Sequence, residues 1–171
     1  MAECPRCHGQ LLTCECLGQP DDDSDEPRYF DWEQHPVSSR WAVFEDNQVT
    51  GYLYLTPPAE QRPIADCWLY NVVEAPSYEE AKRYAEQGGA PPASIGYTSP
   101  DARYDPSTSP HIRFIWSRDG ESVAAEVDGV VLGFITLDDT QAESYSRNLN
   151  RDGEWGNTWD ERLYRSLFKR R

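Results

Sequence analysis

Four of the five cysteines of this 171-residue chain lie within thirteen positions near its start. Cys4 and Cys7 have the C-P-x-C-x-G pattern, in which two sulfurs on a tight turn point at one ion and a glycine follows where a side chain would hinder the turn. Cys14 and Cys16 follow after six residues and complete the four thiolates of a closed zinc site. We therefore expect Cys4, Cys7, Cys14 and Cys16 to hold one structural zinc ion.

Other interpretations of this cluster stay open. His8 directly follows Cys7 and is able to replace one cysteine as a ligand. The cluster is also compatible with a tail that is unliganded or partly oxidised, and with a redox-active pair. A tetrathiolate site has no open position for water, so the zinc would be structural, and its binding would supply the folding free energy of a segment too short to bury a core.

The cysteine count also bears on the compartment. Five cysteines cannot form a complete disulfide set within one chain, and no apolar run follows a basic start. No stretch approaches the roughly 20 apolar residues of a membrane span. We expect a cytoplasmic protein without a membrane segment, in which metal binding is favoured over disulfides and Cys67, in an apolar strand, is a core residue.

The net charge of −14 limits the class of partner. Residues 1–36 contain nine acids and two bases, so half of the net charge lies in about a fifth of the chain. Direct nucleic-acid binding requires a basic surface and is not expected. The charge fits a solvated surface, a basic protein partner, or mimicry of a nucleic acid, and all three stay open.

The residues give no sign of a catalytic site. The three histidines, His8, His35 and His111, stand in no catalytic motif, and no glycine-rich phosphate loop is present. We expect His35 and His111 to lie on the surface. Glu45 and Asp46 are adjacent acids at a turn, where they should diverge and be solvated. The sequence therefore predicts no catalytic residue, no bound organic cofactor and no enzyme activity.

Three regions must position these residues. We expect a zinc knuckle over residues 1–18, an acidic linker over 19–28, and a main domain over 29–171 with an insertion at about 76–110. The aromatic, β-branched runs within 40–55 flank the four residues Glu-Asp-Asn-Gln and predict a hairpin.

Further strands and two helices follow along the chain. Residues 64–73 predict a third strand, and two Asp-Gly pairs, each typical of a type I′ turn, predict a meander with strands at about 111–118, 121–127 and 130–137. Ser77 and Glu80 form a capping box for one helix, which ends at Gly88. Thr158 and Glu161 should cap a second, whose apolar face contains Trp159, Tyr164, Leu163, Leu167 and Phe168. The fold class is therefore α+β, with one antiparallel sheet of about six strands and one or two helices behind the zinc knuckle.

The predicted strands are rich in aromatic residues, namely Trp41, Phe44, Tyr52, Tyr54, Trp68, Tyr70, Phe114 and Trp116. Alternation places Trp41 and Val43 opposite Ala42 and Phe44. Most of these rings should pack in the core. However, the pairs Tyr52 with Tyr54 and Phe114 with Trp116 are candidates to leave one sheet face partly aromatic and exposed, as in many protein-binding surfaces.

The order of four segments resembles a family of short bacterial proteins known only as a domain of unknown function. The segments are WAVFEDNQVTGYLY (41–54), DCWLYNV (66–72), IRFIWSRDGESVAAEVDG (112–129) and WGNTWDERLYRSLF (155–168). The resemblance covers about residues 38–168 and implies a small bacterial cytoplasmic domain without adding an activity. This chain differs in its cysteine knuckle, its acidic linker and its longer insertion at 76–110.

Three functions follow as hypotheses. The first is a non-enzymatic, acidic protein-binding module, similar in character to immunity or inhibitor proteins, that covers a basic partner and uses the loop at 87–110. The second is a zinc-knuckle adaptor or regulator that recognises a ribosome, transcription or defence component. The third is an enzyme of unrecognised type. The sequence does not fix the oligomeric state.

Overall fold

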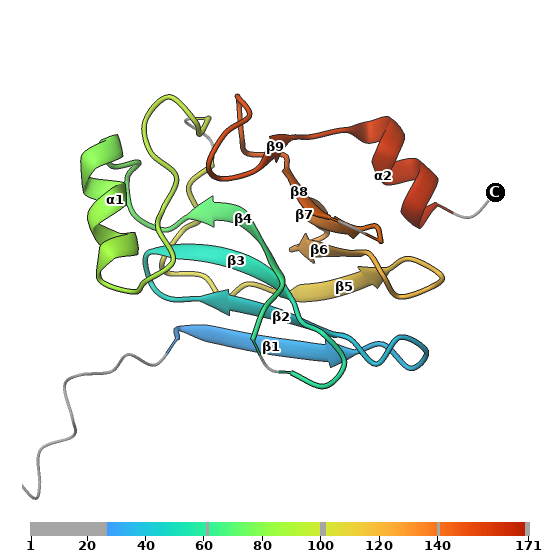
Figure 1. Ribbon diagram of the computed structural model, residues 1–171. Helices are drawn as coiled ribbons and strands as arrows, with labels where there is room; N and C mark the ends of the chain where they lie inside the picture. Colours follow the sequence, from blue (N-terminus) through green and yellow to red (C-terminus); the bar gives the residue numbers. More distant parts are fainter. Residues whose placement is uncertain (1–26, 61, 100–101, 140, 170–171) are drawn as a thin grey trace, which may run out of the picture.

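The computed structural model describes residues 27–60, 62–99, 102–139 and 141–169, which form two β-sheets and two helices (Figure 1). The predicted zinc knuckle and nearly all of the predicted linker lie outside the described residues. The elements in chain order are β1 (Tyr29–Gln34), β2 (Trp41–Asp46), β3 (Thr50–Leu55), β4 (Ala65–Asn71), α1 (Tyr78–Glu86), β5 (Ile112–Trp116), β6 (Val123–Val127), β7 (Val130–Leu137), β8 (Ala142–Ser146), β9 (Asn157–Thr158) and α2 (Glu161–Phe168).

The first sheet has the strand order β1-β2-β3-β4 and is antiparallel throughout. Strands β2 and β3 form the predicted hairpin, with a turn at residues 47–49 in which the Asn47 side chain accepts hydrogen bonds from the backbone N–H groups of Val49 and Thr50. Strand β4 is the predicted third strand. Strand β1 was not predicted, because its alternating aromatic and acidic residues follow directly on the acidic segment.

The second sheet has the order β5-β6-β7-β8-β9 and is antiparallel except for the parallel pair β8 and β9. Strands β5 to β7 are the predicted meander. The expectation of one antiparallel sheet of about six strands is therefore wrong, since the described residues form nine strands in two sheets. The α+β class holds in the coarser sense of a mostly β protein with two helices.

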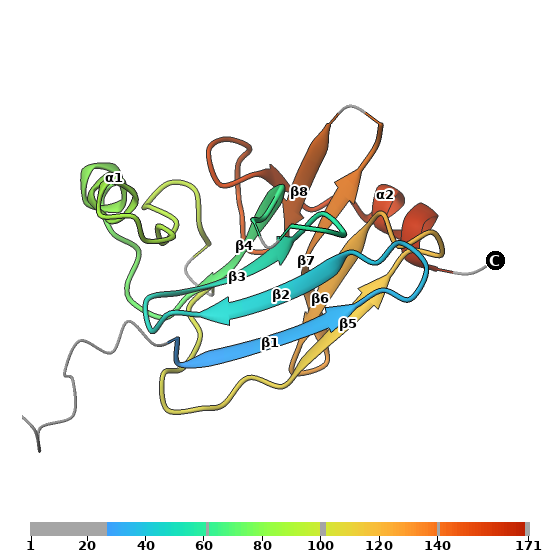
Figure 2. The same ribbon diagram turned by 60° about the horizontal axis from the view of Figure 1, so that its bottom comes forward.

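The two sheets pack face to face, with β4 against β7 and β8, and Figure 2 shows the first sheet in front of the strands of the second. Period-two alternation turns every second residue of these strands inward. The largest buried cluster consists of Ala42, Phe44, Leu53, Leu55, Cys67, Leu69, Tyr70, Val72, Val123, Ala125, Val127 and Ile135. This shared core is why the apolar runs divide between two sheets instead of forming one.

The two helices lie at opposite sides of the molecule (Figure 1). Helix α1 has the predicted capping box, because Ser77 Oγ accepts from the Glu80 N–H at 3.2 Å and the Glu80 side chain accepts from the Ser77 N–H at 3.0 Å. Helix α2 begins two residues later than predicted. Its N-cap is Asp160, whose Oδ1 accepts from the Leu163 N–H at 2.9 Å, whereas Thr158 belongs to β9.

One of the two predicted type I′ turns has the expected conformation. Asp128 and Gly129 have φ angles of 51° and 85°, as both central residues require. At the other turn only Gly120 has a positive φ, of 71°. There the Asp119 carboxylate accepts from the Ser117 hydroxyl and the Glu121 N–H, which stabilises a different turn.

The turn at Gly129 leads to a stability prediction. We expect Gly129→Ala to lower the free energy of unfolding by about 1 kcal/mol, because alanine pays a steric cost in the left-handed region. Packing adds nothing, since a methyl group here would meet no atom within 4 Å. Urea unfolding followed by circular dichroism measures the effect. Gly89→Ala is the matched control, since Gly89 has no positive φ, and equal stabilities of the two variants would contradict the prediction.

Candidate functional site

The outer face of the second sheet is covered by α2. The Phe134 ring on β7 lies 5.1 Å from the Trp159 ring, 5.8 Å from Tyr164 and 5.8 Å from Phe168, measured between centroids. Phe134 is fully buried as a result. This confirms the predicted apolar face of the C-terminal helix, which packs on the aromatic residues of that side of β7.

The outer face of the first sheet is covered over only part of its area. Tyr52 and Trp68 are buried there beneath α1 and the segments that contain Ala93 and Trp155. The Tyr52 hydroxyl donates to the Pro91 carbonyl at 2.6 Å. The expectation that Tyr52 contributes to an exposed face is therefore wrong, because its side chain is 5% exposed.

The rest of this face forms an open groove of about 520 Å³, which we call the aromatic groove. Two of its rings, Phe30 and Trp32, are 52% and 56% exposed, the largest exposures of any aromatic side chain among the described residues. The residues that line the groove are Phe30, Trp32, Trp41, Val43, Glu45, Tyr54, Thr56 and Pro63. Contiguous exposed apolar surface of this kind marks interaction sites.

Strand register determines how the groove is built. Phe30 of β1 pairs with Glu45 of β2, which pairs with Tyr52 of β3. In the neighbouring row Trp32 pairs with Val43, and Val43 pairs with Tyr54. Directly paired side chains on one face lie about 4.5–5.5 Å apart at Cβ, and diagonal ones about 7–8 Å. Glu45 therefore has aromatic side chains on both sides and at two diagonals.

Two carboxylates of this face, those of Glu45 and Asp66, have no ion-pair partner among the described residues. Burial raises the pKa of Glu45, and burial likewise raises the pKa of Asp66. The pKa of Tyr54, which lies between them, is raised first by burial and then by the charges of both acids. Within the part of the chain that the structure describes, neither carboxylate makes an ion pair or a side-chain hydrogen bond. A nearby cation would stabilise the ionised form of both carboxylates.

A second hollow of about 390 Å³ shares Tyr54 with the aromatic groove and continues it across the sheet. Its lining adds Asp66 and Glu154, and the Glu154 carboxylate accepts from the Tyr78 hydroxyl at 2.6 Å. The full lining is Tyr52, Tyr54, Asp66, Gly88, Gly89, Ala90, Pro91, Glu154 and Trp155. The residues that line these two hollows include three acids and no lysine, arginine or histidine.

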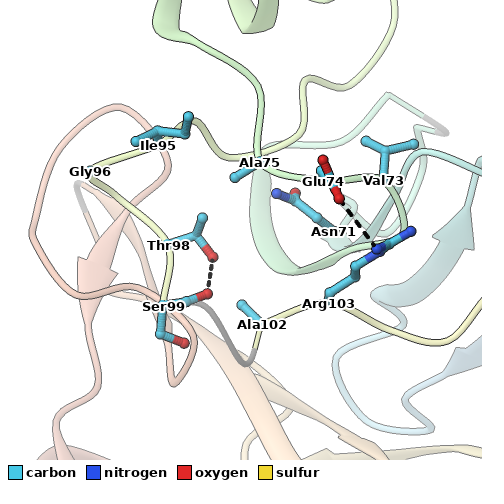
Figure 3. A pocket seen from close by; sticks show the side chains of 10 residues that line it. All are labelled: Asn71, Val73, Glu74, Ala75, Ile95, Gly96, Thr98, Ser99, Ala102 and Arg103. Atoms are coloured by element: carbon cyan, nitrogen blue, oxygen red, sulfur yellow. Dashed lines mark hydrogen bonds and ion pairs between the residues drawn. The ribbon is translucent and has the colours of Figure 1, made fainter.

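A hollow at the end of β4, shown in Figure 3, is a weaker candidate. Its polar side chains are occupied in holding the chain. Asn71 exchanges hydrogen bonds of 2.9 Å with both backbone groups of Ala93. Arg103 donates to the Val72 carbonyl at 3.1 Å and lies 3.9 Å from the Glu74 carboxylate. We interpret this hollow as a by-product of loop anchoring.

Two predicted surface positions are buried. His35 is 9% exposed, and its Nδ1 accepts from the N–H groups of Val37 and Ser38 beside the Trp116 ring, so its prediction as a surface residue is wrong. Asp46 is 0% exposed and is not solvated. These side chains hold backbone turns and ion pairs inside the domain, which the sequence pattern around them does not reveal.

The other predictions about single residues divide by position. Cys67 is confirmed as a buried free cysteine, and burial raises the pKa of its thiol. His111 is exposed, as expected. The predicted ligands Cys4, Cys7, Cys14 and Cys16 lie outside the described residues, so the zinc site stays a prediction. Among the residues from 27 to 169 that are described, no group of three or more His, Cys, Asp or Glu side chains is arranged to hold a metal ion.

Native mass spectrometry tests the zinc prediction. We expect the chain, expressed without added metal, to carry one zinc ion that is lost on acid denaturation, because four thiolates form a closed site. A variant with serine at Cys4, Cys7, Cys14 and Cys16 should carry none, and Cys67→Ser is the matched control that should keep it. A bare mass, or one reduced by two to four hydrogens, would contradict zinc binding and indicate free thiols or disulfides.

The exposed rings of the aromatic groove were missed by the sequence analysis. Phe30 and Trp32 lie in the run Phe-Asp-Trp-Glu, whose strict alternation of apolar and acidic residues is the period of a strand with one polar face. The neighbouring acidic segment masks this signal, so the stretch resembles only the start of the domain. Of the predicted exposed rings, Tyr54 alone lines the groove.

Comparison with known proteins adds no relative. None of the described helices is long and apolar enough to cross a membrane. The resemblance to a bacterial family of unknown function stays a prediction. No protein-family model matches the chain, and no curated protein or solved structure matches it significantly.

Proposed function

We propose that this chain is a non-enzymatic binding module that takes a basic protein partner on the outer face of its first sheet. The observation that carries the proposal is the aromatic groove, in which Phe30 and Trp32 are more than half exposed although α2 and α1 bury comparable rings elsewhere. Protein interfaces are enriched in such rings at their centres.

Charge supports a basic partner. The net charge is −14, and the acids Glu45, Asp66 and Glu154 line the two connected hollows without a basic neighbour in the lining. A field of one sign accelerates encounter with a partner of the opposite sign and is screened by salt. The affinity should therefore fall as the salt concentration rises.

The biological role belongs to the same proposal. A small acidic module that covers a basic surface fits an immunity-like or inhibitor-like role in a bacterial cytoplasm, with the zinc knuckle as a structural appendage. The cysteine count supports the zinc knuckle and the cytoplasmic location, and the resemblance supports a bacterial protein. The groove is lined mainly by aromatic and apolar side chains with one partly desolvated acid, Glu45, and such a lining suits holding a partner better than turning over a substrate.

Affinity capture from the source organism tests the proposal with full-length bait. We expect a basic protein to be captured at low salt and released at high salt, and Phe30→Ser with Trp32→Ser to abolish its capture. With the captured protein purified, the double variant should bind about 30-fold or more weakly, because truncation of a central aromatic residue costs about 2 kcal/mol or more.

Two control baits make the result specific. Val37→Ser with Ile95→Ser removes two apolar side chains that are 77% and 71% exposed and lie outside the groove, so binding should persist. The variant with serine at all four N-terminal cysteines should also bind. Capture that requires the cysteines and survives loss of Phe30 and Trp32 would favour the zinc-knuckle adaptor and contradict the proposal.

A further inference from the structure

The Glu45 carboxylate stands in an unusual position on the aromatic groove. The side chains around it are the rings of Phe30 and Tyr52, directly paired, and of Trp32 and Tyr54, on the diagonals. Among the described residues no cation lies in ion-pair contact with it. A carboxylate partly removed from water, without a counter-ion, costs free energy that a bound cation would recover.

The surrounding rings add a second attraction for positive charge. The face of an aromatic ring attracts a cation through its quadrupole, and the attraction increases when the cation loses water. This chain already uses that contact elsewhere. The Arg147 guanidinium lies 3.8 Å from the Trp159 ring centroid, and the Arg151 guanidinium lies 4.7 Å from Tyr97. In the groove the rings and the acid are present, and the cation must come from a partner.

The chain itself does not supply a suitable occupant next to the groove. Residues 1–26, which precede β1, contain seven acids and one base and would be repelled by Glu45. A second copy carries the same net charge of −14. A separate basic polypeptide complements the groove in charge.

We infer that the aromatic groove binds one arginine side chain of the partner. The guanidinium stacks on the ring of Trp32 or Tyr54 and pairs with Glu45. The inference rests on the proposed function. Arginine suits the groove better than lysine, because its planar head group stacks on rings, pairs with a carboxylate in a two-point contact and is more weakly hydrated. Glu45 would be the specificity-determining residue of the interface.

Peptides of six arginines, six lysines or six citrullines test the inference in titrations of the full chain, followed by tryptophan fluorescence. Citrulline keeps the planar shape without the charge. We expect the arginine peptide to bind, the lysine peptide to bind at least about threefold more weakly, and the citrulline peptide not to bind. Glu45→Gln should weaken arginine-peptide binding about tenfold or more, as loss of a charged hydrogen-bonded pair does.

Glu79→Gln is the matched control, since it removes the same charge from an exposed position on α1. It should change the affinity less than about twofold. Equal losses in the two variants would show that only the general field attracts the peptide and would overturn the inference. Equal binding of the arginine and lysine peptides would overturn the choice of arginine. A concentration-dependent dimer that Glu45→Gln dissociates would assign the groove to a second copy instead.

The outcomes separate this inference from the proposed function. Suppose that Phe30→Ser with Trp32→Ser abolishes binding of the natural partner while Glu45→Gln leaves it unchanged. The proposed binding face is then correct, and the proposed arginine-binding site is wrong. If neither change affects the partner, both ideas are wrong. If both changes weaken the partner and the Glu79→Gln control does not, both hold.

Discussion

Replacement of Asp46 by alanine should lower the free energy of unfolding by about 3–5 kcal/mol, the cost of leaving one charge of a buried pair without its partner. Asp46 is fully buried, and its Oδ2 accepts from Arg28 Nη2 at 2.5 Å and from the Tyr70 hydroxyl at 2.8 Å. The hydrogen bond and charge of Asp46 raise the pKa of Arg28. Without this carboxylate the guanidinium stays charged and mostly enclosed.

Urea unfolding monitored by circular dichroism measures this effect, with Glu126→Ala as the matched control. Glu126 pairs with Arg113 at 2.6 Å, but the Arg113 side chain is 62% exposed, so its loss should cost no more than about 1 kcal/mol. Asp46→Asn should fall between the two, because the amide keeps an acceptor for the Gln48 N–H. Similar costs for Asp46→Ala and Glu126→Ala would show that the buried pair contributes little.

At alkaline pH the protein should unfold at lower denaturant concentrations than at neutral pH. Burial raises the pKa of Tyr52, of Tyr70 and of Cys67, which are each 5% exposed or less. In the unfolded chain these groups lose their protons near pH 10 for tyrosine and near pH 8.5 for cysteine. The unfolded state then binds fewer protons than the folded state, so the free energy of unfolding falls as the pH rises.

The expected size is about 1.4 kcal/mol per pH unit for each group once the pH exceeds its unfolded pKa, which totals about 6 kcal/mol for the three groups at pH 11. Urea midpoints at pH 8, 10 and 11 measure this decrease. Tyr52→Phe should reduce the slope of this decrease above pH 10 by the contribution of one tyrosine, about 1.4 kcal/mol per pH unit. In this variant the Trp155 indole N–H still donates to the Pro91 carbonyl. Midpoints that stay constant up to pH 11 would mean that these groups ionise within the folded protein.

The parts of the fold that were predicted correctly depend on local chemistry. The β2–β3 hairpin, the β5–β7 meander and the capping box of Ser77 and Glu80 each follow from residues within a few positions of one another. The division into two sheets depends on contacts between β4 and β8, which are distant in sequence. Hydrophobic periodicity identifies a strand but not the sheet to which it belongs.

The candidate site was predictable only in part, for the same reason. Tyr54 and Glu45 lie on a hairpin that the sequence identifies, yet Glu45 was expected to be solvated because the rings beside it come from another strand. Phe30 and Trp32 become neighbours of Glu45 only through the β1–β2 register. Asp46 was mistaken for a solvated acid because its partner Arg28 lies at the edge of the acidic segment.

Along strands β2 and β3, residues that face the groove alternate with residues that face the core. This alternation affects how the sequence of the protein can change in evolution. On β2 and β3, Val43, Glu45 and Tyr54 line the groove, whereas their chain neighbours Phe44 and Leu53 are buried in the shared core. The proposed binding positions and the core positions are therefore separate, interleaved sets on the same strands. A lineage of such chains would be free to change partners by substitution at every second residue, while the intervening residues keep the fold.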